Sequence, residues 1–173
     1  MELRFVAPQL RSLDETAAEL CACSIWNDER PMRGLAGLLD WRLAGRLSAM
    51  QKRGFLNGQK GEVLLVPGMP NLPFEKVLVF GLGPRARFGE DDFRDAIERL
   101  ARTLLGVHVR RAMVELPGRA GDAIEPERAV TLALECVGAS TEIDAWWIVE
   151  DAAARQRIEL RAVDEGRRVN ARR

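Results

Sequence analysis

Two segments decide the fold of this chain: Gly61-Glu62-Val63-Leu64-Leu65-Val66-Pro67 and Lys76-Val77-Leu78-Val79-Phe80-Gly81-Leu82-Gly83. Each is a short apolar run bounded by Gly or Pro, which is the pattern of a strand buried on both faces. A helical segment from Glu90 to Leu105 follows and opens with acidic residues. A strand that ends in Gly-Leu-Gly and leads to a helix is an α/β unit, and folds of this class often hold ligands there.

The same alternation continues outward from these segments. Strands are predicted over residues 3–6, 20–26, 111–116 and 145–149, and helices over residues 34–53 and 126–137. Residues 151–155 are predicted to be a short helix or loop, and residues 157–163 a strand or a helix. This order predicts an α/β fold: one three-layer domain over residues 1–160, with a mixed, mostly parallel sheet and helices on both faces.

The remaining residues, 161–173, are predicted to form a basic, flexible tail. They carry five arginines against Asp164 and Glu165, so the net charge of this segment is 5 − 2 = +3. A flexible basic tail of this kind can give weak, salt-sensitive binding to nucleic acid.

Each predicted helix carries apolar residues at helical spacing, which predicts one buried face per helix. The residues of the three stripes are Leu35, Leu39, Leu43, Leu47 and Met50, then Phe93, Ile97, Leu100 and Leu104, and finally Val130, Leu134 and Val137.

Composition excludes several classes of protein. The net charge is zero, with 47% hydrophobic and 30% charged residues, which gives no global electrostatic case for nucleic-acid or membrane binding. No apolar stretch approaches the roughly 20 residues of a membrane span, and the first residues lack a signal-peptide pattern, so we expect a cytoplasmic protein. The odd cysteine count argues against disulfides, and Cys21 and Cys23 are expected to be buried on one face of a strand.

The side chains offer little chemistry. His108 is the single histidine, so multi-histidine zinc sites are excluded, and it is expected to be a surface or structural residue. No serine lies in a Gly-x-Ser-x-Gly motif, and Ser140 is expected at a helix exit. The acids Glu90, Asp91 and Asp92 are expected to favour a helix start rather than to bind a metal. No catalytic residue, metal site or cofactor is predicted.

One turn has a case for ligand binding: Gly81, Leu82 and Gly83, with Arg85 close behind. Glycines let the backbone approach a phosphate, and the arginine adds positive charge. The third glycine of a dinucleotide fingerprint is absent, however, and Pro84 removes an amide donor. Phosphate or nucleotide binding and a plain strand-to-helix turn are therefore both open.

Tryptophans are the candidates for a protein interface, where this residue type is favoured. Trp41 falls off the apolar stripe of its helix. Trp146 and Trp147 are adjacent on a strand and therefore face opposite sides, so they either span both faces of a covered sheet or leave one ring at an interface.

Residues 20–116 resemble the amino-terminal domain of the two-zinc leucyl (cytosol) aminopeptidases. The resemblance lies in an early strand, a long Leu/Ala/Gly helix ending Gln51-Lys52-Arg53-Gly54-Phe55, the segment Asn57-Gly58-Gln59-Lys60-Gly61-Glu62, and the two strands after it. It implies a fold similar to the macro domain, and since macro domains bind ADP-ribose it adds slight weight to Gly81–Gly83 as a ligand site. The family's metal ligands and its Asn-Thr-Asp-Ala-Glu-Gly-Arg motif belong to the carboxy-terminal domain and have no counterpart here.

Together these observations favour a non-catalytic homologue of that domain, without a cofactor, that acts in protein association or regulation. Its expected partner is a second copy (a homo-oligomer) or a full-length aminopeptidase, and no membrane. The alternatives are a nucleotide or ADP-ribose-type ligand at Gly81–Gly83, and weak DNA binding through the arginine tail.

Overall fold

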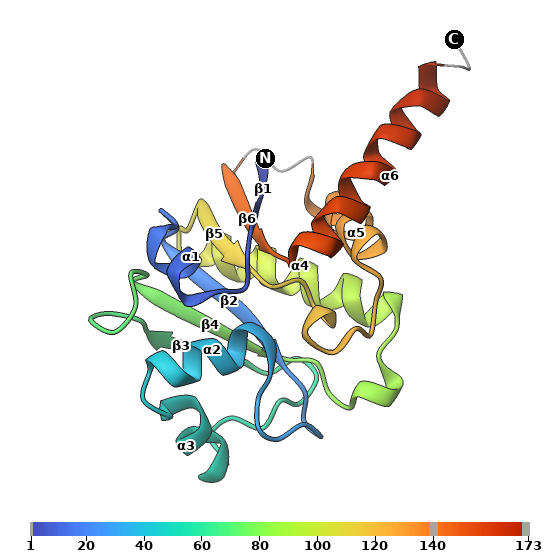
Figure 1. Ribbon diagram of the computed structural model, residues 1–173. Helices are drawn as coiled ribbons and strands as arrows, with labels where there is room; N and C mark the ends of the chain where they lie inside the picture. Colours follow the sequence, from blue (N-terminus) through green and yellow to red (C-terminus); the bar gives the residue numbers. More distant parts are fainter. Residues whose placement is uncertain (1, 139–141, 171–173) are drawn as a thin grey trace.

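A computed structural model describes residues 2–138 and 142–170 as one six-stranded sheet with helices on both faces (Figure 1). The strand order is β1-β6-β5-β2-β4-β3, and every neighbouring pair is parallel except β3 with β4. The elements in chain order are β1 (Glu2–Val6), α1 (Leu10–Glu15), β2 (Leu20–Ile25), α2 (Gly34–Arg42), α3 (Arg46–Lys52), β3 (Val63–Pro67), β4 (Lys76–Gly81), η1 (Arg85–Arg87), α4 (Glu90–Gly106), β5 (Arg111–Val114), η2 (Arg119–Gly121), α5 (Pro126–Val137), β6 (Ala145–Val149) and α6 (Ala152–Asn170).

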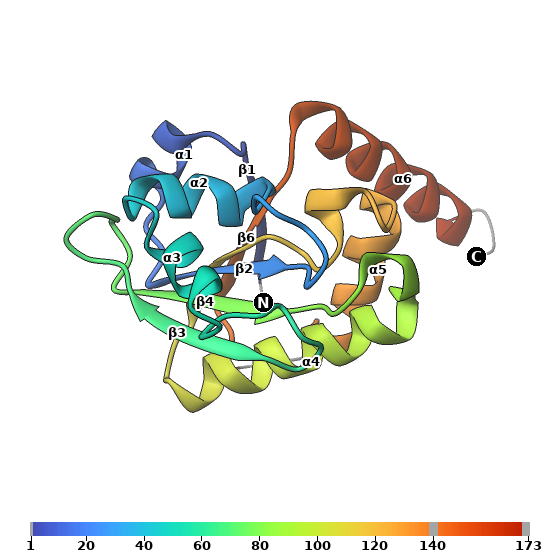
Figure 2. The same ribbon diagram turned by 90° about the horizontal axis from the view of Figure 1, so that it is seen from below.

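Two apolar cores lie on the two faces of the sheet. Because successive strand residues point to opposite faces, Leu20 and Ala22 of β2 enter one core while Cys21 and Cys23 enter the other. The first core also takes side chains from α4, α5 and α6, and the second takes side chains from α1, α2 and α3. Figure 2 shows α4 and the α2–α3 pair on opposite sides of the strands. The predicted three-layer, mixed and mostly parallel α/β fold is confirmed.

The prediction for β3 was wrong in one respect. Its sequence is as apolar as that of β4, yet Val63 and Leu65 are 40% and 41% exposed. The reason is that β3 is an edge strand with a single neighbour, so it lies at the margin of the region that the helices cover. Val66, in contrast, is buried in the core on the α2–α3 side.

The helix expected over residues 34–53 is two helices, α2 and α3. Ala44 and Gly45 between them adopt positive φ angles of 53° and 77°, which a continuing right-handed helix does not allow. The carboxylate of Asp40 accepts a hydrogen bond from the backbone N–H of Ser48 at 3.0 Å. A side chain of α2 thus satisfies an otherwise unpaired N–H in the first turn of α3. The leucine stripe hides the break, because the leucines of both helices pack into the same core.

Three further boundaries differ from expectation. Helix α1 has no apolar period long enough to predict it. Strand β5 ends at Val114 instead of residue 116. Helix α6 is continuous from Ala152 to Asn170, so the backbone of residues 161–170, expected in the flexible tail, is helical. Figure 1 shows its second half projecting from the body of the domain.

The helix faces follow the sequence with one exception. The four predicted residues of α4 are buried, and so are Val130 and Val137 of α5, but Leu134 is 43% exposed.

In the part of the chain that the structure describes, no helix combines the length and the apolar character that crossing a bilayer requires.

Candidate functional site at the carboxyl ends of the strands

The five parallel strands end at one edge of the sheet, which is where open α/β folds place ligands. Four of them lead there into segments with polar or glycine residues: 26–28 after β2, 82–84 after β4, 115–118 after β5 and 150–151 after β6. The turn expected to bind a ligand therefore lies at the edge that the fold class favours.

The amides of this turn are already used by the chain itself. Gly81 donates its N–H to the carbonyl of Glu62 at 2.9 Å, Leu82 to Ile25 at 3.0 Å, and Gly83 to Gly58 at 2.8 Å. Loop 57–62 thus takes the N–H groups of Gly81 and Gly83, and β2 takes that of Leu82, so the donors that a phosphate would need are already bonded.

Close packing explains the glycine at position 81. A Cβ atom there would lie 2.1 Å from the carbonyl oxygen of Gln59, so only glycine fits beneath this loop. The cavity beside the turn measures about 10 Å³, which is room for one water molecule and far too little for a nucleotide.

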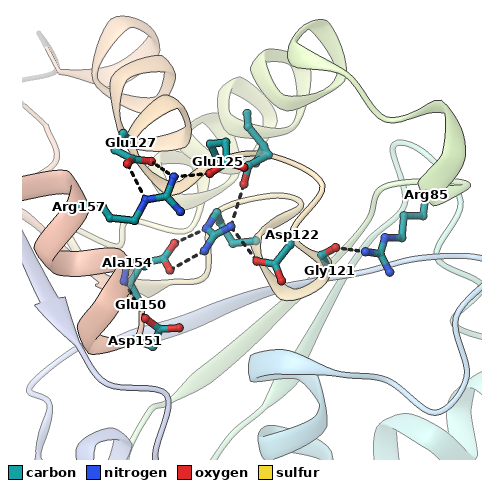
Figure 3. A network of polar contacts seen from close by, with 11 residues as sticks. Arg85, Gly121, Asp122, Glu125, Glu127, Glu150, Asp151, Ala154 and Arg157 are labelled. Carbon is teal, nitrogen blue, oxygen red and sulfur yellow. Dashed lines mark hydrogen bonds and ion pairs between the residues drawn. The ribbon is translucent and has the colours of Figure 1, made fainter. Parts of the chain in front are cut away.

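Arg85 also binds within the chain. Its guanidinium donates to the carbonyl of Gly121, as Figure 3 shows, and its backbone N–H donates to the carboxylate of Asp28 at 3.2 Å. The side chain thereby joins η1 to η2 across the edge of the sheet. The four candidate ligand residues lie together as expected, and each is engaged by the protein's own atoms.

Sequence reasoning missed the strongest polar contact at this edge, a buried ion pair between Arg119 and Glu150. The guanidinium meets the carboxylate at 2.6 and 3.1 Å, and the two side chains are 9% and 4% exposed. Arg119 also donates to the carbonyl of Ile124 at 2.8 Å and to Asp122 at 3.2 Å. Figure 3 shows the carboxylates of Glu150 and Asp122 in this network of contacts. Burial opposes the charge of Arg119, but the bond to Glu150 outweighs it and leaves the pKa raised.

Glu115 is a second buried carboxyl that sequence reasoning missed. Its Oε1 accepts the N–H of Leu35 at 2.7 Å in the first turn of α2, while its Oε2 has no hydrogen-bond partner. Burial raises the pKa of Glu115 to about 8, the bond from Leu35 opposes the rise, and the charge of Glu150 adds to it. The available signal was that Glu115 and Glu150 each directly follow an apolar strand at the ligand-binding edge.

A cleft of about 300 Å³ lies beside the buried pair, between the loop after η2 and the start of α6. Arg157 of α6 lies at this cleft and meets Glu127 at 2.7 Å and also Glu125, both at the start of α5 (Figure 3). The Asp151 carboxylate accepts the N–H of Ala154 at 2.8 Å, which caps α6. Both arginines at the cleft are neutralised by carboxylates, so the cleft has no excess positive charge to hold an anionic ligand.

The acids at the start of α4 have structural roles. Asp92 accepts the N–H of Gly89 at 3.0 Å and bonds to Lys60, while Glu90 forms an ion pair with Arg128. Within residues 2–138 and 142–170, no group of three or more His, Cys, Asp or Glu side chains is arranged to hold a metal ion.

Cys21 and Cys23 are fully buried, and burial raises the pKa of both thiols. They therefore remain thiols rather than nucleophilic thiolates. His108 is exposed and lies in a turn with a φ of 57°, ahead of β5 rather than in it. Ser140 and the arginines at 172 and 173 lie outside the described residues, as do the side chains of Arg167 and Arg168.

The three tryptophan candidates have different surroundings. Trp41 is 71% exposed at the end of α2. Trp147 is half-buried, and the guanidinium of Arg4 lies 5.4 Å from its ring centroid. Trp146 is wholly buried in the core on the α4 side, so it is a packing residue, and the expectation that it serves a protein interface is corrected. The adjacent rings face opposite sides of the sheet, which was one of the two alternatives.

Large exposed apolar side chains gather in one part of the chain. Seven occur among the described residues, and five of them fall between positions 41 and 69, a stretch that builds the end of α2, α3 and the edge strand β3. These five are Trp41, Phe55, Val63, Leu65 and Met69. Val63 and Leu65 lie in register with Phe80 and Leu78 and therefore face the α4 side of the sheet, whereas Trp41 belongs to α2 on the other side, so the five residues are separate candidates for a protein contact rather than one continuous patch.

Comparisons with known proteins agree with this architecture. The family model described as the N-terminal domain of the cytosol aminopeptidase family matches residues 24–141. A probable cytosol aminopeptidase of Thioalkalivibrio sulfidiphilus is 32% identical over 109 residues, which cover 61% of this chain and 22% of that protein. The matched part of the chain covers 14–22% of the length of such curated relatives.

Solved structures confirm the fold. A tomato leucine aminopeptidase mutant superposes with a TM-score of 0.65 at 15% identity, over 92% of this chain and 35% of the tomato chain. The macrodomain of Thermus aquaticus DarG superposes with a TM-score of 0.65 at 16% identity, over 86% of this chain and 98% of that domain. The predicted macro-domain-like fold is therefore confirmed.

Proposed function

This chain belongs to the cytosol aminopeptidase family, and from that premise we propose that it is a non-catalytic domain acting in protein association, with a cytosol aminopeptidase as its partner in the cytoplasm. The observation that carries the proposal is the contrast between two regions. The ligand-binding edge of the sheet is closed by the chain's own atoms, whereas residues 41–69 expose five large apolar side chains.

The closed edge argues against chemistry in this domain. Catalysis needs reactive groups that a substrate can reach, but the carboxyls of Glu115 and Glu150 are buried, and the guanidinium of Arg119 is held by Glu150. The thiols of β2 are inaccessible for the same reason. We therefore assign no peptide hydrolysis to these residues.

The exposed apolar side chains argue for a partner. A tryptophan ring at 71% exposure costs solvation free energy unless another surface covers it, and tryptophan is enriched among the residues that carry binding energy. Trp41 belongs to α2, which packs on the side of the sheet that holds the second core. We propose Trp41 as the centre of the contact.

A binding experiment with purified proteins tests this function. The immobilised chain is expected to bind a full-length cytosol aminopeptidase of its host, and Trp41→Ala is expected to weaken binding about tenfold or more. Leu134→Ala is the matched control, because Leu134 is also exposed and apolar but lies on α5. Failure to bind the aminopeptidase at micromolar concentrations, or equal losses in the two variants, contradicts the proposal. The isolated chain is expected to hydrolyse no amino-acid amide with added Zn²⁺ or Mn²⁺.

A further inference from the structure

The outer edge of β3 presents unpaired backbone groups that can be assigned residue by residue. Gly81 donates to the carbonyl of Glu62, and Gly68 donates to the carbonyl of Glu75, so the residues at both ends of β3 bond toward β4. In an antiparallel pair these bonds alternate along the strand. Residues 64 and 66 therefore also turn toward β4, and Val63, Leu65 and Pro67 turn their backbone groups outward.

The two edges of the sheet differ in how they are protected. Strand β1 at the other edge carries Glu2 and Arg4, which form an ion pair at 2.9 Å, and charged side chains of this kind prevent strands from pairing edge to edge. Strand β3 reads Val-Leu-Leu-Val-Pro and carries no charge. Within the described residues, no strand pairs with β3 on its outer side.

We propose that β3 pairs with β3 of a second copy of this chain, antiparallel about a twofold axis through Leu65. The proposal rests on the proposed role in protein association and names a second copy as a further partner. In this register the two Leu65 residues exchange N–H···O=C bonds, and Val63 of each copy donates to the carbonyl of Pro67 of the other. Because Pro67 has no N–H, one backbone hydrogen bond is lost at each end, and four hydrogen bonds remain between the two β3 strands.

Self-complementarity is the reason to assign a second copy rather than an unrelated chain. Position 62 of one copy faces position 68 of the other, so Glu62 meets a glycine and no like charges oppose each other. Leu65 lies in register with Leu78 of β4 and therefore points to the α4 side of the sheet. In the pair, the two exposed Leu65 side chains meet directly and cover one another, with Val63 on either side.

Charge substitutions at position 65 test this geometry. Sedimentation across a micromolar to millimolar concentration range is expected to show a monomer–dimer equilibrium for the wild-type chain. Leu65→Lys and Leu65→Glu are each expected to be monomeric, because two like charges then face each other across the axis. An equimolar mixture of these two variants is expected to dimerise again. Leu160→Lys places the same charge at an exposed leucine of α6 and is expected to dimerise like the wild type.

Each outcome decides the matter, provided that circular dichroism shows both variants folded. A monomeric wild-type chain overturns the inference, as does a Leu65→Lys variant that dimerises as the Leu160→Lys variant does. A mixture that stays monomeric overturns the register centred on Leu65. A wild-type chain that binds the aminopeptidase but remains monomeric overturns this inference alone and leaves the proposed function standing.

Discussion

Glu115 makes the stability of this domain depend on pH in a direction that can be worked out. Its pKa is about 8 in the folded protein against an ordinary value of 4.5, so between these values the folded chain holds a proton that the unfolded chain releases. The folded state therefore binds more protons, and its stability falls as pH rises through this window. Each pH unit inside the window is worth about 1.4 kcal/mol, so the loss from pH 5 to pH 8 is about 4 kcal/mol.

The substitution Glu115→Gln isolates this effect. Glutamine keeps a carbonyl oxygen for the N–H of Leu35 but cannot ionise. Urea unfolding at pH 5, 6, 7 and 8 is expected to show the free energy of unfolding falling with pH in the wild type and staying nearly level in the variant. At pH 7 the variant is expected to be more stable by about 3 kcal/mol. Glu98→Gln, at an exposed position of α4, is expected to follow the wild type. Parallel curves for the wild type and Glu115→Gln would refute the reasoning.

Three further predictions concern the closed edge. Gly81→Ala is expected to destabilise the domain by about 1–3 kcal/mol in urea unfolding, because its Cβ meets the carbonyl of Gln59, whereas Gly106→Ala, in open space, is expected to be neutral. Equal effects would contradict the packing argument. Arg119→Met and Glu150→Met are each expected to lower the free energy of unfolding by about 3–5 kcal/mol, because each leaves a buried charge unpaired. The double variant is expected to lose less than the sum of the two. Additive losses in this double-mutant cycle would count against the ion pair. Calorimetry with ADP-ribose is expected to show no heat at millimolar ligand, and a saturating isotherm would reopen the Gly81–Gly83 turn as a ligand site.

Much of the fold could be predicted because the strands and helices carry clear periodic signals. The face of α4 follows from Phe93 and Ile97, and the opposite orientations of Cys21 and Leu20 follow from strand geometry. Val63 and Leu65 show the limit, since a sequence does not state whether an apolar strand will lie in the centre or at the edge of its sheet. Burial of β3 residues depends on the strand order, which is a property of the whole chain.

The position of the candidate site could be predicted from the sequence, but the hydrogen bonds that already occupy its backbone amides could not. The sequence places Gly81–Gly83 at the carboxyl end of a strand, where ligands bind in this fold class. It does not show that loop 57–62 will fold back and accept the N–H groups of Gly81 and Gly83. Arg119 and Glu150 are 31 positions apart, and neither residue lies in a motif, so their pairing emerges only when β6 and η2 meet at one edge.

The two buried cysteines of β2 give this domain a built-in reporter of its own opening. Cys21 and Cys23 lie in a central strand between β4 and β5, with no exposed surface, so a thiol reagent reaches them only when that strand leaves the sheet. Cys136 on α5 is half-buried, so we expect it to react with the reagent in the native state. The rate at which the reagent labels Cys21 and Cys23, divided by its rate with Cys136, therefore measures how often the centre of the sheet opens in native buffer, without denaturant.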